Sequence, residues 1–143
     1  MRNRKGTFQA PRLELEILAN EHSEIRCRHF ELDEAILRGE GSPRILEAAG
    51  VLVRSMLQHF THEEELRKKI PFPIGAAQNR AGIDLMAELL RIEVGLQQGE
   101  VYAALRLRGL CKRWMRGHID LEKTEFEIGA IVSSSEPDRL QAP

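Results

Sequence analysis

Two segments of this chain carry a histidine followed four residues later by a glutamate. They are His59 with Glu63, and His118 with Glu122. On an α-helix, positions i and i+4 lie on one face, so each pair can direct an imidazole nitrogen and a carboxylate oxygen to the same point. Such nitrogen and oxygen donors are typical ligands of transition metals. Two helices of this kind, facing each other, would enclose a metal ion with four ligands.

The length and charge of the chain set the class of protein. The chain has 143 residues, which is enough for one domain with a substantial core. Lys and Arg number 21 against 22 Asp and Glu, so no basic excess favours nucleic-acid binding. No apolar run reaches the ~20 residues that span a bilayer, and residues 1–11 lack the apolar stretch of a secretory signal. We therefore expect a cytoplasmic protein with no nucleic-acid or membrane partner.

The two cysteines, Cys27 and Cys111, lie far apart and form no Cys-x-x-Cys motif. This spacing disfavours both a thiolate zinc site and a disulfide framework. We expect both cysteines to be small buried residues of the core.

Glycine and proline interrupt the sequence at four places and leave long segments in which apolar residues recur every three or four positions. The predicted helices are 11–37, 43–70 with Ser42 as the N-cap, 76–97 and 100–128. The flanks, 1–10 and 129–143, are predicted to be flexible arms. Four long helices joined by short turns predict an all-α fold, an antiparallel up-down-up-down four-helix bundle.

The candidate ligands lie on the apolar faces of these helices. His22 aligns with Ile25 and Leu32, and His59 and Glu63 align with Met56 and Leu66. An unpaired carboxylate inside an apolar face costs several kcal/mol. A bound cation would compensate Glu63 and would keep the imidazoles neutral.

In an antiparallel bundle, three histidines fall at one level along the axis. His59 and His118 lie about two-thirds of the way along the second and fourth helices, and His22 lies about a third of the way along the first. The third helix would present Gln78 and Gly82 at this level, and neither is a typical ligand. His29 lies two turns beyond His22, about 10 Å away, which is too far to share a metal. His62 lies beside the ligand face, which favours a surface position or a supporting role over coordination.

These segments resemble the hemerythrin-like, or HHE cation-binding, four-helix bundles. The resemblance is carried by Glu21-His22, by His59-Phe60-Thr61-His62-Glu63-Glu64 with Pro71-Phe72-Pro73 after it, and by His118-Ile119-Asp120-Leu121-Glu122. It covers roughly residues 13–128. It implies a non-haem iron site, usually di-iron, with His22, His59 and His118 as imidazole ligands and Glu63 and Glu122 as bridging carboxylates. These ligands alone also suit zinc or manganese.

The chain departs from this family in its third helix. Members carry histidines near the start of that helix, where Gln78 and Gly82 stand here. Three alternatives remain open: a di-metal centre completed by water or an outside ligand, a mononuclear site, or a lapsed site that keeps a polar core. Gly82 either opens the wall of the site to a small ligand or allows a close helix contact.

The function that the resemblance implies is binding or sensing of a small ligand such as oxygen, nitric oxide, peroxide or iron itself. Oxygen carriage is disfavoured, because it is associated with a five-histidine set that this chain lacks. One alternative is an iron-dependent oxidase or an iron donor in cluster repair. Another is a metal-free helical bundle that acts as an interaction module. Metal binding or sensing is favoured over enzymatic turnover, and a homodimer is one option for the oligomeric state.

Overall fold

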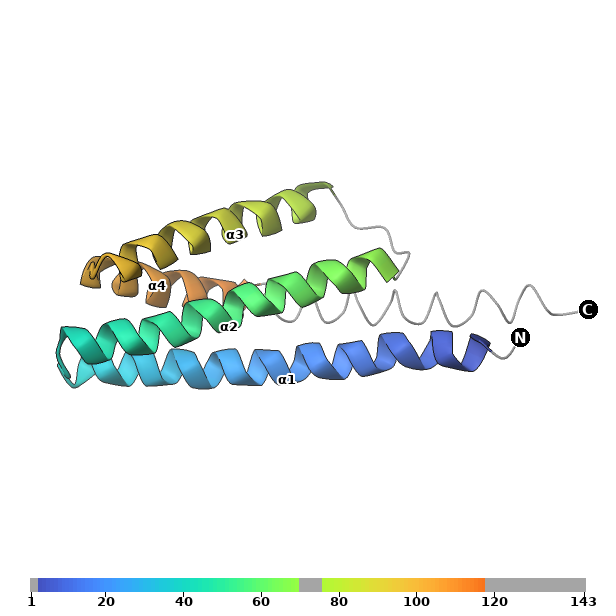
Figure 1. Cartoon of the computed structure of the whole chain (residues 1–143), viewed down its shortest axis with the longest axis horizontal. Coiled ribbons are helices and arrows are strands. Elements are labelled where there is room, and N and C mark those ends of the chain that lie inside the picture. The colour runs from blue at the N-terminus through green and yellow to red at the C-terminus, as the bar shows by residue number, and fades with distance from the viewer. Residues whose placement is uncertain (1–2, 70–75, 118–143) are drawn as a thin grey trace, which may run out of the picture.

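The computed structural model describes the backbone of residues 3–69 and 76–117, and the side chains of residues 16–66, 68 and 82–117. The described backbone forms the helices α1 (Asn3–Leu37), α2 (Ser42–Lys69), α3 (Ala76–Gln97) and α4 (Val101–Gly117). Successive helices run in opposite directions, as the colour gradient in Figure 1 shows. The predicted all-α, up-down four-helix bundle is therefore confirmed.

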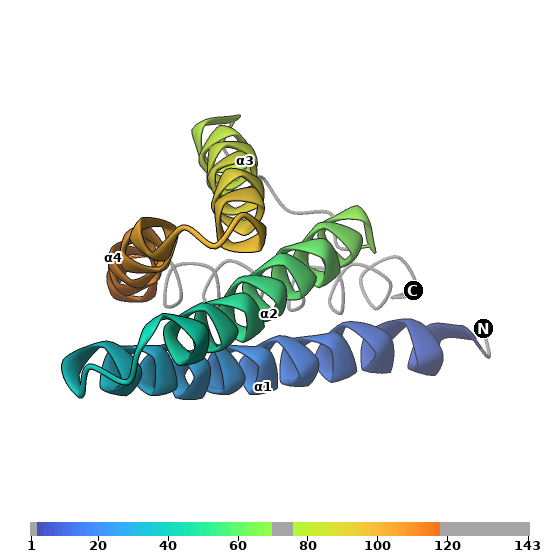
Figure 2. The same cartoon turned by 60° about the vertical axis from the view of Figure 1, so that its left-hand side comes forward.

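The helices pack in chain order, and α4 closes the bundle. Each helix contacts the next one along the chain, and α4 also contacts both α1 and α2. The long α1–α2 hairpin forms one side, with α3 and α4 beside it (Figures 1 and 2). The helices α1, α2 and α4 therefore all contact one another and share one part of the core.

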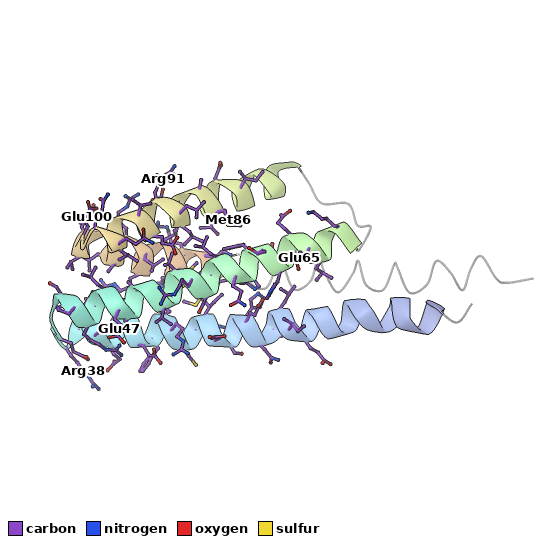
Figure 3. All side chains as sticks on the ribbon, viewed as in Figure 1. Arg38, Glu47, Glu65, Met86, Arg91 and Glu100 are labelled. Atoms are coloured by element: carbon purple, nitrogen blue, oxygen red, sulfur yellow. The ribbon has the colours of Figure 1, made fainter. Side chains whose placement is uncertain are left out.

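The buried residues follow the predicted apolar faces. The core contains Ile25, Leu32, Leu52, Met56, Leu66, Leu89, Ile92, Leu107, Cys111 and Trp114, all at most 3% exposed. Labelled charged side chains such as Arg38, Glu47 and Arg91 point away from this core (Figure 3). Burial of these apolar surfaces is the main force that holds the helices together.

Glycine ends α1 and α3 in the same way. Gly39 has φ 61° and Gly99 has φ 78°, a left-handed conformation that glycine adopts without strain. After α1, the amide of Glu40 donates to the carbonyl of Ala35 at 3.0 Å, and after α3, the amide of Glu100 donates to that of Gly95 at 3.0 Å. Both ends are therefore Schellman motifs, which satisfy the last carbonyls of each helix and allow a short reversal.

The predicted start points differ in detail from the observed ones. α1 begins at Asn3, so residues 3–10, for which the sequence predicts a flexible arm, are helical. The helix then runs on through Pro11. The carbonyl of Gly41 accepts the amide of Ile45 at 3.1 Å, so Gly41 rather than Ser42 takes the N-cap position of α2. The predicted extension of the fourth helix to residue 128 lies outside the described residues. No described helix is both long and apolar enough to cross a membrane.

Candidate metal centre

His22 of α1 and His59 of α2 meet in the interior of the bundle. Their Nε2 atoms are 3.1 Å apart, and their ring centroids are 4.6 Å apart. His22 is 7% exposed and His59 is fully buried. The prediction that these two histidines share one level is therefore confirmed.

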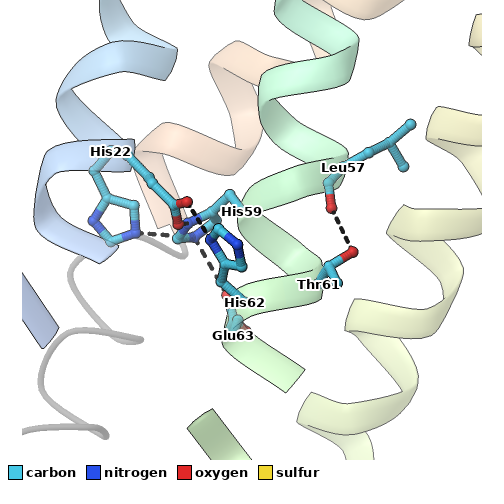
Figure 4. Close-up of polar contacts among 7 residues, drawn as sticks. His22, Leu57, His59, Thr61, His62 and Glu63 are labelled. Atoms are coloured by element: carbon cyan, nitrogen blue, oxygen red, sulfur yellow. Dashed lines mark hydrogen bonds and ion pairs between the residues drawn. The ribbon is translucent and has the colours of Figure 1, made fainter. Parts of the chain in front are cut away.

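Glu63 lies one helical turn beyond His59, on the same face of α2. Its Oε2 atom is 3.4 Å from His59 Nε2, and the residue is only 3% exposed. Figure 4 shows His22, His59 and Glu63 gathered between α1 and α2. The structure thus brings together the three predicted site residues whose side chains it describes. The other two, His118 and Glu122, lie outside the described residues.

Two further residues complete a hydrogen-bonded cluster. Glu21 Oε1 is 3.0 Å from His59 Nδ1, and Glu21 Oε2 bonds to His62 Nδ1. Burial raises the pKa of Glu21, but the hydrogen bonds and charge interactions with His59 and His62 outweigh it and hold the pKa below its ordinary value. The sequence assigned His62 a surface or supporting position, and the structure places it against Glu21. Sequence reasoning gave Glu21 no role of its own, although it directly precedes His22.

Aromatic rings wall the histidine pair. Trp114 of α4 is 3% exposed, and its ring centroid lies 6.0 Å from that of His22 and 5.5 Å from that of His59. Phe60 packs on His59 and Trp114 with centroid distances of 5.6 and 5.3 Å. These rings exclude water from one side of the imidazoles and lower the local dielectric constant, which strengthens electrostatic interactions there.

The spacing of the donor atoms fits adjacent ligands of one ion. Two atoms each about 2.1 Å from a metal, at angles of about 90–110°, lie about 3.0–3.4 Å apart. The Nε2–Nε2 distance of 3.1 Å and the Nε2–Oε2 distance of 3.4 Å fall in this range. However, within residues 3–69 and 76–117, no group of three or more His, Cys, Asp or Glu side chains is placed so that it could hold a metal. The described side chains offer part of a ligand set rather than a complete one.

Gly82, the glycine of α3 singled out from the sequence, has no described residue packed closely against it. A Cβ atom added at Gly82 would meet no other described atom within 4 Å. This finding gives no support to a close helix contact at that position. The side chain of Gln78 lies outside those described, so the predicted approach of both residues to the metal level stays a prediction.

His29 and the two cysteines lie outside this cluster. His29 is half-buried on α1, and Cys111 is fully buried in the core. The expectation that both cysteines are buried is wrong for Cys27, which is exposed. Cys27 lies two residues beyond Ile25, about 200° around the helix from that core position, so it faces solvent.

The two thiols should differ sharply in reactivity. Burial raises the pKa of Cys111 to about 12, so near neutral pH this thiol stays almost entirely protonated and unreactive. We expect a disulfide reagent to modify Cys27 at once and Cys111 only after unfolding. Thiol titration of the native and denatured protein measures this difference. Cys27→Ser should abolish the fast phase, and two fast thiols in the native protein would contradict the burial of Cys111.

Comparisons with known proteins do not assign the chain to a family. No family model, curated protein or solved structure matches this sequence at a significant level.

Proposed function

We propose that this chain is a non-haem iron protein that binds or senses a small ligand such as oxygen or nitric oxide. His22, His59 and Glu63 would hold the metal together with His118 and Glu122. The observation that carries the proposal is the 3.1 Å approach of two buried imidazole Nε2 atoms next to a buried carboxylate. The resemblance of the sequence motifs to hemerythrin-like bundles supports iron as the metal.

The chemistry of the donor set supports a cation in this cluster. The imidazoles of His22 and His59 and the carboxylate of Glu63 lie together in an apolar interior. They favour a divalent ion, because its charge offsets the cost of burying Glu63. Five protein ligands divided between one or two metals would leave coordination positions open. A bound iron ion would supply an open position for a small ligand.

The environment favours ligand binding over turnover of a large substrate. Trp114 and Phe60 cover the imidazoles, and Cys111, the one buried thiol of the described residues, has a pKa raised far from neutrality. A small molecule can reach a site of this kind without a wide cleft. Gly82, where an added Cβ atom would meet no described atom within 4 Å, is our candidate for the point of entry.

Metal loading tests the proposal directly. We expect the full chain, purified without a chelating column and loaded anaerobically with Fe(II), to bind one or two equivalents. Trp114 is the sole tryptophan of the chain, and its ring lies next to both histidines, so its fluorescence should be quenched during the titration. Elemental analysis gives the stoichiometry.

A bound fraction below about a tenth of an equivalent would contradict the proposal and favour the metal-free interaction module. If the metal binds, nitric oxide or azide should perturb the iron absorption bands. Steady consumption of oxygen by the loaded protein would instead favour the oxidase alternative.

A further inference from the structure

A continuous set of hydrogen bonds leads from the edge of the bundle to its interior. His62 Nδ1 bonds to Glu21 Oε2, Glu21 Oε1 lies 3.0 Å from His59 Nδ1, and His59 Nε2 lies 3.1 Å from His22 Nε2. Exposure falls along this path, from 37% for the side chain of His62, through 15% for Glu21, to 0% for His59. One carboxylate of α1 is therefore held at both oxygens by imidazoles of α2.

We propose that His62 is a positioning residue: by holding Glu21 against His59 Nδ1, it keeps the proton of His59 on Nδ1 and leaves Nε2 as the electron-pair donor of the site. The effect on metal affinity rests on the proposed function. The position of the proton in the metal-free protein does not.

The hydrogen-bonding capacity of the groups supports this assignment. An ionised carboxylate only accepts hydrogen bonds, so the nitrogen facing Glu21 must carry a proton. Glu63 Oε2 lies 3.4 Å from His59 Nε2, a longer contact than the 3.0 Å between Glu21 Oε1 and Nδ1, so Glu21 holds the single proton of a neutral His59 more strongly. Nε2 of His59 is then an acceptor. With His59 in this tautomer, the 3.1 Å contact in the metal-free protein requires His22 Nε2–H to be the donor. A metal would use the same electron pair, and carboxylates commonly fix the tautomer of such ligands in this way.

His62 restricts the conformation of the Glu21 carboxylate, which accepts the hydrogen bond from His59 Nδ1. Glu21 has three rotatable side-chain bonds, and holding such a side chain in one conformation costs conformational entropy. A contact at Oε1 alone leaves the carboxylate free to turn toward solvent. His62 lies three residues after His59 on the same face of α2, so this helix holds both carboxylate oxygens of Glu21.

Nitrogen-15 NMR of the metal-free full chain tests the proposal, because the chemical shifts of an imidazole distinguish a protonated from an unprotonated nitrogen. In the wild type we expect His59 to carry its proton on Nδ1. In His62→Leu we expect a mixture of the two tautomers. His62→Asn should restore the wild-type pattern, since the asparagine amide places an N–H donor where Nδ1 was.

The matched control is Thr61→Val. Thr61 is the neighbouring residue, is exposed, and donates only to the carbonyl of Leu57 at 3.0 Å (Figure 4). This change should leave the His59 signals as they are. If His62→Leu fails to fold, Glu21→Gln provides a second route, because it keeps the shape and removes the charge. A wild-type His59 protonated on Nε2, or a tautomer unaffected by His62→Leu and by Glu21→Gln, would overturn the proposal.

Fe(II) affinity provides the second measurement. His62→Leu should weaken binding about 10- to 100-fold, the usual effect of removing a group that supports a ligand, and His62→Asn should recover most of it. Equal affinity in wild type and His62→Leu would overturn the role toward the metal. If the wild type binds no iron, the proposed function fails, whereas the NMR result still decides the positioning role.

Discussion

Glu63→Ala should weaken Fe(II) binding by more than about a hundredfold, because it removes a ligand rather than a group that supports one. Glu63 is 3% exposed and its Oε2 lies 3.4 Å from His59 Nε2, so its carboxylate is a buried anion beside the nitrogen that we assign to the metal. Glu122→Ala should have a similar effect, since we assign Glu122 the corresponding role after His118. Isothermal titration of the metal-free protein measures both affinities.

Glu64→Ala is the matched control for this result. Glu64 is the next residue of α2 and is exposed, so its carboxylate points about 100° away from that of Glu63. The change should alter Fe(II) affinity less than about twofold, as expected for an exposed side chain directed away from the histidines. Circular dichroism checks that each variant keeps its helices. Comparable losses in Glu63→Ala and Glu64→Ala would mean that the carboxylate of Glu63 is not a ligand.

Most of the fold could be predicted from the sequence because its local signals agree. Gly39 and Gly99 end helices through their left-handed conformations, and the apolar residues between such breaks recur with helical spacing. The bounds of α3, Ala76–Gln97, coincide with the predicted segment. The meeting of His22 and His59 followed from counting residues along two antiparallel helices of regular rise.

Other features depend on tertiary contacts that no periodic pattern encodes. Glu21 lies about 100° around α1 from His22, at the edge of the buried face, so its role depends on how α1 is rotated against α2. The ring of Trp114 lies beside the histidines only because α4 packs against both α1 and α2. Pro11 removes one backbone donor and favours a helix start, yet α1 continues through it.

Trp114 links the stability of the bundle to the integrity of the candidate site. Its ring is 3% exposed and packs against His22, His59 and Phe60. Trp114→Ala would leave a large cavity where α4 meets these residues. We expect the change to lower the free energy of unfolding by about 3–5 kcal/mol, a large share of the stability of a domain of this size. Urea unfolding followed by circular dichroism measures it.

Tyr102→Ala offers the matched comparison, because Tyr102 is another aromatic residue of α4 but is 71% exposed. Its removal should change the unfolding free energy by less than about 0.5 kcal/mol. Trp114→Phe keeps an aromatic ring and should recover part of the loss. A cost for Trp114→Ala as small as that for Tyr102→Ala would show that α4 does not close over the histidines. Iron binding by a folded Trp114→Phe variant then separates the two roles of the ring: unchanged affinity would assign Trp114 to packing alone, whereas weaker binding would mean that its shape also holds the imidazoles in place.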